Sequence, residues 1–111
     1  MTRQLIARNS DAAGPILTSL EQDEEVWESA YAEVMSRPDL ARLHAFWLHY
    51  YGASAEMRFA GTELNELCAD LRAMLSARAV LTPAARAFLE AFERLAHEAY
   101  TQGAVIDVIA D

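Results

Sequence analysis

The sequence has few residues suited to a covalent or metal-linked framework: its 111 residues include one cysteine, Cys68, and three histidines. One cysteine cannot form an internal disulfide, and a domain of this length can be stable without one. No apolar stretch approaches the ~18 residues that would span a bilayer. The N-terminal residues lack the uninterrupted apolar run of a secretory signal. These absences predict a single domain, residues 1–111, in the cytoplasm and without a membrane segment.

Lysine is absent, so all nine basic residues are arginine, and 17 acidic residues give a net charge of −8. Binding to nucleic acid or anionic lipid requires clustered basic residues, which this sequence does not have. A strongly acidic chain attracts basic surfaces instead. The composition therefore predicts a basic protein as the partner and no direct contact with nucleic acid or membrane.

Motifs of known chemistry are also absent. The four glycines are scattered and form no phosphate-binding loop, and no nucleophile elbow is present. Cys68 lies within an apolar stripe of helical spacing, which indicates a small buried side chain rather than a nucleophile. The sequence thus predicts no catalytic residue, no cofactor and no enzymatic activity.

The histidines do not predict a metal site. His44 and His49 are five residues apart and would lie on different sides of a helix. Glu93 and His97 have i, i+4 spacing and could supply two ligands, but two ligands on a helix surface do not close a site. A ligand carrier using this pair is kept as an alternative.

Four segments carry apolar residues at helical spacing. The first is predicted to run from Thr18 to about Met35, because Thr18 and Glu21 have the spacing of a capping box. The second is predicted to begin at Ser36, with Asp39 repeating that spacing, and to end at Gly52.

The third predicted helix begins at Thr62. The fourth has Thr82 as N-cap and Pro83 in its first turn, and ends at Gly103. Residues 53–61 fit either a short strand or a helical turn. The fold class predicted is therefore mainly α: four amphipathic helices in a compact bundle, bracketed by β-prone chain ends.

Those chain ends are the apolar segments "RQLIAR" (3–8) and "GAVIDVIAD" (103–111). A short strand is unstable alone and needs an edge to pair with. We predict that the two ends pair with each other. Pairing with a partner's strand or a second copy, or an extension of the last helix, are the alternatives.

Two stretches are candidates for partner binding. The first is "EQDEEVWE" (21–28), with five acids and no base, which either caps a helix or forms a docking face. The second is "FWLHYY" (46–51), whose aromatic side chains either fill the centre of the bundle or anchor an interface. The residues predicted to bind the partner are Glu21, Asp23, Glu24, Glu25, Glu28, Trp47, Tyr50 and Tyr51.

The last predicted helix, "FLEAFERLAHEAYTQG", runs into "AVIDVIAD", and this arrangement in a small acidic chain resembles the bacterial immunity proteins that neutralise a cognate toxin. The resemblance implies a non-catalytic protein that blocks a toxin, often through an acidic face. The first hypothesis is therefore an immunity-type inhibitor that docks on a basic partner. A phage-encoded inhibitor that mimics nucleic-acid phosphates and a homo-oligomeric structural module, such as a homodimer, are the alternatives.

Overall fold

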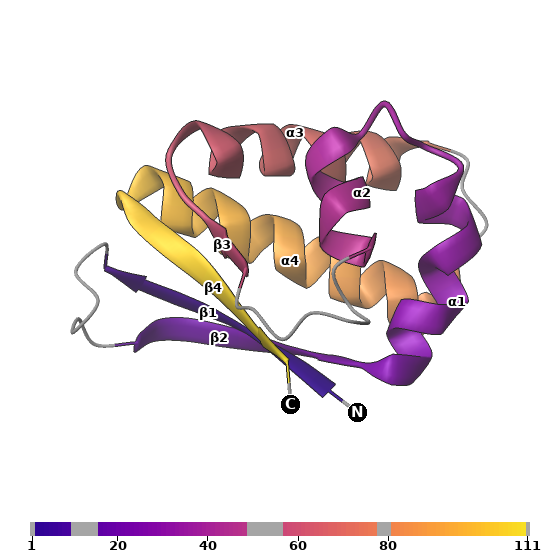
Figure 1. Ribbon diagram of the computed structural model, residues 1–111, viewed down its shortest axis with the longest axis horizontal. Coiled ribbons are helices and arrows are strands. Elements are labelled where there is room, and N and C mark those ends of the chain that lie inside the picture. The colour runs from indigo at the N-terminus through magenta and orange to yellow at the C-terminus, as the bar shows by residue number, and fades with distance from the viewer. Residues whose placement is uncertain (1, 10–15, 49–56, 78–80, 111) are drawn as a thin grey trace.

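A computed structural model describes residues 2–9, 16–48, 57–77 and 81–110. The strands of this part of the chain are β1 (Thr2–Asn9), β2 (Ile16–Asp23), β3 (Met57–Phe59) and β4 (Ala104–Ala110). Its helices are α1 (Glu24–Met35), α2 (Ala41–Leu48), α3 (Thr62–Ser76) and α4 (Pro83–Thr101). Figure 1 shows them as a compact α+β fold, so the prediction of a mainly α bundle is wrong.

The sheet is antiparallel, with strand order β2-β1-β4-β3. Its centre is the pair formed by the two ends of the chain, in which Leu5 lies opposite Val108 and Ala7 opposite Ile106. The predicted pairing of the chain ends is confirmed. Gly103, with a φ of 65°, makes the turn from α4 into β4, a conformation that favours glycine.

β2 is the strand that the sequence did not predict. Residues 18–23 were assigned to the first helix, but they pair with β1, where Leu20 lies opposite Leu5. The capping-box spacing of Thr18 and Glu21 is a local preference, and pairing with β1 outweighs it. The helix instead begins at Glu24.

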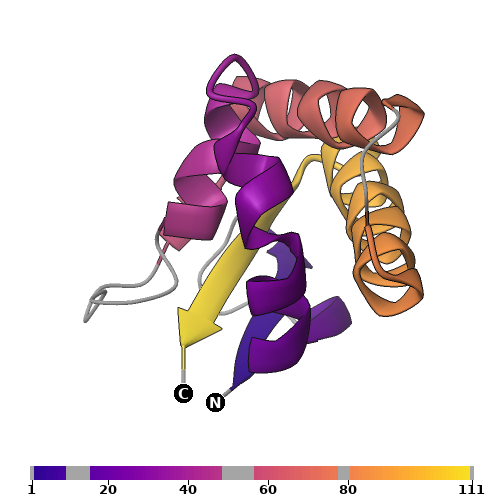
Figure 2. The ribbon, with the colours of Figure 1, turned by 90° about the vertical axis from the view of Figure 1, so that its right-hand side faces the viewer.

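One face of the sheet is covered by the helices. α4 packs against β1, β2 and β4, and α3 packs on α4 (Figures 1 and 2). Alternate strand residues such as Leu5 and Ile106, both fully buried, point into this layer and join one core with the apolar faces of the helices. Burying each side chain of this size contributes roughly 1.5–3 kcal/mol.

The other face of the sheet carries a charge cluster. Asp107 on β4 is 4% exposed. Its carboxylate accepts hydrogen bonds from Arg58 on β3, at 2.6 and 3.1 Å, and lies 3.2 Å from Nε of Arg8 on β1. The three side chains link three neighbouring strands, and two guanidinium groups compensate the buried carboxylate.

Three of the helix boundaries test the capping predictions. α4 has Thr82 as N-cap with Pro83 following, and α3 begins at Thr62, so both predictions are confirmed. The predicted cap of the second helix is wrong, because Asp39 binds Arg37 instead. Asp70 of α3 caps α2 across the core, accepting from the backbone N–H groups of residues 42 and 43 at 2.9 and 3.2 Å.

Candidate functional site

The acids predicted to bind a partner lie where β2 passes into α1. We call the set Glu21, Asp23, Glu24, Glu25 and Glu28 the acidic junction. Glu21 and Asp23 belong to the strand and the other three to the helix, so the prediction that the first helix begins at Thr18 and contains all five is wrong. The strand continues into the helix with no intervening loop, which keeps the five side chains on one stretch of the molecule.

Asp23 organises this transition. Its backbone is extended, and its side chain accepts a hydrogen bond from the backbone N–H of Val26 at 3.1 Å, which makes it the N-cap of α1. Glu24 and Glu25 occupy the first turn, where negative charge is stabilised by the helix dipole. The same acids that begin the helix therefore also place negative charge at the surface.

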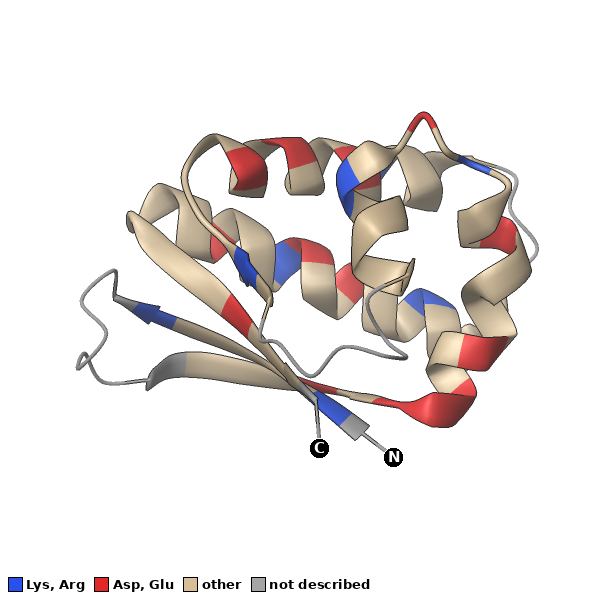
Figure 3. Ribbon diagram, viewed as in Figure 1, with Lys and Arg blue, Asp and Glu red and all other residues tan. Residues whose placement is uncertain are grey.

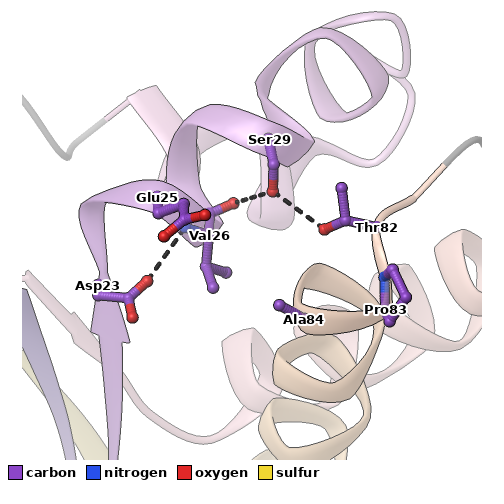
Figure 4. A pocket seen from close by; sticks show the side chains of 7 residues that line it. All are labelled: Asp23, Glu25, Val26, Ser29, Thr82, Pro83 and Ala84. Carbon is purple, nitrogen blue, oxygen red and sulfur yellow. Dashed lines mark hydrogen bonds between the residues drawn. The ribbon is translucent and has the colours of Figure 1, made fainter.

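A hollow of about 350 Å³ adjoins the junction (Figure 4). Its walls are the start of α1, with Asp23 and Glu25, and the start of α4, with Thr82. A hydroxyl contact of 3.3 Å between Ser29 and Thr82 joins the two helices. Its remaining lining residues, Val26, Pro83 and Ala84, are apolar.

This hollow suits a cationic side chain better than an anion. Two helix N-termini meet there, and their exposed N–H groups would by themselves attract an anion. At α1 the Asp23 carboxylate accepts one of these groups, and at α4 the Thr82 hydroxyl accepts from Ala85 N at 3.1 Å. The charges that remain at the rim are the carboxylates of Asp23 and Glu25, which favour an ammonium or guanidinium group.

The acidic junction also differs from the other acids in its ion pairs. On α2, α3 and α4 some carboxylates are paired: Arg42 binds Glu63 and Glu66, and Arg72 binds Glu93. Glu90 and Glu98 of α4 are exposed and isolated from one another along the helix. Glu21, Glu25 and Glu28 are exposed and form no ion pair with any residue that the structure describes. Figure 3 shows the acidic stretch where β2 meets α1. Among the described residues, this is where acids without a described ion pair lie closest together along the chain.

Trp47, which the sequence predicted as an interface anchor, does not lie at this surface. Its side chain is fully buried, because its indole packs between helices. Trp47 Nε1 donates to the backbone carbonyl of Trp27, and Trp27 Nε1 donates to that of Trp47, both at 2.9 Å. This reciprocal pair ties α1 to α2. Tyr50 and Tyr51 lie outside the described residues.

A buried charge beside the tryptophan pair was missed by the sequence analysis. Arg3 on β1 is 1% exposed, and its guanidinium lies 4.0 Å from the centre of the Phe46 ring. It donates to the side-chain oxygen of Gln22 at 3.0 and 2.7 Å and to the Phe46 carbonyl at 3.2 Å. Alternation along "RQLIAR" places Arg3 on the same face as Leu5, which is the one sequence signal that indicates its burial.

The remaining candidates for chemistry have structural roles. Cys68 is 2% exposed, and burial raises the pKa of its thiol, so the reactive thiolate is disfavoured. Arg72 binds Glu93 and also contacts His97 Nδ1 at 3.2 Å, so the two residues considered as metal ligands hold an arginine instead. Among the described residues, no group of three or more metal-ligating side chains is present. None of the described helices is long and apolar enough to cross a bilayer.

Comparison of the chain with models of protein families, with curated proteins and with solved structures finds no match. A functional proposal for this chain therefore depends on its own surface and charge.

Proposed function

We propose that this chain is a non-enzymatic, immunity-type inhibitor that binds a basic partner protein through the acidic junction. The observation that carries the proposal is the clustering of acids within residues 21–28. The arginines of α2, α3 and β3 bind neighbouring carboxylates, whereas Glu21, Glu25 and Glu28 are exposed without an ion pair among the described residues. Exposed charge of one sign steers a partner of the opposite sign and accelerates association.

The hollow beside the junction supplies the specific contact. An arginine or lysine side chain of the partner would lay its methylene groups on Val26, Pro83 and Ala84 and bring its charged end to the carboxylates of Asp23 and Glu25. Such a contact adds orientation to the long-range attraction. A toxin or another enzyme that acts on nucleic acid offers this kind of basic surface, and acids occupying its phosphate sites would block it. We expect the function in the cytoplasm.

The experiment compares three tagged proteins as bait in extracts of the encoding organism, at low and high salt. The test variant is Glu25→Lys with Glu28→Lys. The matched control, Glu33→Lys with Glu90→Lys, changes net charge equally at positions on α1 and α4 outside the junction. We expect one basic partner, read by mass spectrometry, to be retained by the wild type and the control, lost by the test variant and released by salt.

Equal retention by all three proteins would contradict a role for the acidic junction. A captured partner whose own enzymatic activity is unchanged by a stoichiometric amount of the chain would contradict inhibition while leaving the contact in place. The extracts should come from cells that express the basic proteins of the organism, including its toxins and its enzymes that act on nucleic acid. Recovery of the bait alone from such extracts would contradict the proposed function as a whole.

A further inference from the structure

The outer edge of β2 is the longer of the two edges of the sheet. β2 has eight residues and β3, at the opposite edge, has three. β2 pairs with β1 on one side, and no other described strand pairs with it on the other. Alternate residues of such a strand direct N–H and C=O groups away from the sheet, where they can pair with a further strand.

Three hollows, which we call the row, lie between the β2 side of the sheet and the helices, two of them against α4 and one between the starts of α1 and α4. α4 runs in the opposite direction to β2 (Figure 1). One hollow of about 160 Å³ lies between Thr18 and the end of α4, at Glu98 and Gln102. The next, of about 190 Å³, is lined by Thr18, Leu20 and Leu95 among others. The hollow of about 350 Å³ at Asp23 completes the row. β2 is thus flanked by space for side chains from Thr18 to Leu20 and again at Asp23.

Charge along the row is acidic at both ends. Asp23 and Glu25 line one terminal hollow, and Glu98 lines the other. The middle hollow is lined by Leu20 and Leu95, with Arg94 as its basic residue, and it shares Glu98 with the hollow beside it. From Thr18 to Asp23 the strand advances five residues, or about 17 Å at about 3.3 Å per residue. A strand of about seven residues would span that distance, with alternate side chains entering the row.

We propose that an extended segment of the partner adds to the outer edge of β2 as a further antiparallel or parallel strand, with basic residues at both ends and apolar residues between them. The backbone of the segment pairs with β2, and its side chains occupy the three hollows against α4. This inference deepens the proposed function, on which it rests, by naming the element of the partner that is bound.

A basic segment fits this edge better than a second copy of the chain. Each copy carries a net charge of −8, so two copies repel one another. β2 itself contains Glu21 and Asp23 and no basic residue, and α1 continues it with further acids. A second β2 would bring more carboxylates to hollows whose ends are already acidic.

The first test uses a synthetic probe, the blocked peptide Ac-Arg-Thr-Val-Thr-Val-Thr-Arg-NH2. Its arginine and valine residues share one face at the spacing of the hollows. Two further peptides carry backbone N-methyl groups. In one, both valines are methylated, which removes amide donors from one edge of the peptide strand. In the other, the second and third threonines are methylated, which removes donors from the opposite edge. Charge and side chains are the same in all three peptides, so electrostatic attraction alone cannot distinguish them.

Binding to the full chain is measured by isothermal titration calorimetry and by amide hydrogen exchange. We expect one methylated peptide to bind about tenfold or more weakly than the parent and the other to bind nearly as well, because only one edge of an added strand is used. We also expect slower exchange at β2 amides and unchanged exchange at β3. Equal binding of all three peptides, or no binding of the parent, would overturn strand addition.

A matched pair of variants tests the groove from the protein side. Ala91→Trp on α4 fills the middle hollow, whereas Ala69→Trp places the same side chain at an exposed position of α3 that lines none of the three hollows. We expect the first to weaken peptide binding about tenfold and the second to leave it unchanged. A chain that is dimeric without peptide, with β2 amides already protected, would overturn the proposal in favour of self-pairing.

These outcomes are separable from those of the capture experiment. If captured partner binding depends on Glu25 and Glu28 but not on Ala91→Trp, the acidic junction binds the partner without an added strand. If it depends on neither, the proposed function fails together with this inference.

Discussion

The pair Trp27–Trp47 and the acidic junction lie close together in the fold, and the sequence predicted that Trp47 and the acids both bind the partner. In the structure they have opposite relations to solvent. Trp47 is fully buried and exchanges hydrogen bonds with Trp27, whereas Glu21, Glu25 and Glu28 are exposed. Aromatic side chains are enriched at the centre of interfaces and polar side chains lie at their rim, but of Trp47 and the acids only the acids are at the surface here. The comparison therefore separates residues that hold α1 in place from residues that α1 presents.

The largest expected effect is at the tryptophan pair. Trp47→Ala removes a fully buried indole and one of the two reciprocal hydrogen bonds. We expect a loss of about 3–5 kcal/mol in the free energy of unfolding, measured by urea denaturation. Leu48→Ala, at the next residue of α2 and 53% exposed, is the control and should change stability by about 0.5 kcal/mol or less. Similar losses in both variants would show that Trp47 has no special structural role.

Arg3 gives the next largest effect on the buried side of the comparison. Arg3→Met keeps an apolar stem but leaves the Gln22 side-chain oxygen and the Phe46 carbonyl without the donors they now have. We expect a loss of about 1–3 kcal/mol in the free energy of unfolding. The control is Arg94→Met, since Arg94 is exposed on α4. Unchanged stability in Arg3→Met would mean that burying the guanidinium costs as much as its contacts contribute.

Carboxylates can also be structural, and Asp70 sharpens the contrast with the acidic junction. It caps α2 from another helix, so Asp70→Ala should lower the free energy of unfolding by about 1 kcal/mol. Asp39→Ala tests the cap that the sequence predicted. Because Asp39 only pairs with Arg37 at the surface, its loss should have a smaller effect in thermal or urea unfolding. A larger loss of stability in Asp39→Ala than in Asp70→Ala would contradict the role of Asp70 as the cap of α2.

The elements that could be predicted are those whose signals are local. α3 and α4 have a continuous apolar stripe, and Thr82 with Pro83 marks the start of α4. The pairing of the chain ends followed from the instability of an isolated strand. What failed depended on distant residues: β2 takes its conformation from β1, and the cap of α2 comes from Asp70, 28 residues away from the N–H group that it accepts. The spacing of residues within a segment indicates neither the pairing of β2 with β1 nor the capping of α2 by Asp70.

The candidate site also has features that could be predicted from the sequence and features that could not. The excess of acids in "EQDEEVWE" is visible in the sequence, and the structure describes them at the β2–α1 transition. Whether an acid has a base beside it, and whether Trp47 faces solvent, depend on how the helices pack. The hollow at Asp23 needs α4, whose start is almost sixty residues further along the chain, so no local pattern could indicate it.

The smallest effect on stability is expected at the acidic junction itself. Glu21→Gln, Glu25→Gln and Glu28→Gln together remove three exposed carboxylates that have no ion pair among the described residues. Two contributions oppose each other: relief of like-charge repulsion stabilises the fold, and loss of Glu25 from the first turn removes a favourable interaction with the helix dipole, about 0.3–1 kcal/mol.

We therefore expect the free energy of unfolding of the triple variant to lie within about 0.5 kcal/mol of the wild-type value at low salt. The difference should be smaller still at high salt. Asp23→Ala is the control in the same segment, because removing the N-cap should cost about 1 kcal/mol at either salt concentration. A large, salt-independent loss in the triple variant would mean that these carboxylates hold the β2–α1 transition together. They would then belong with the tryptophan pair, and the distinction between the two regions would fail.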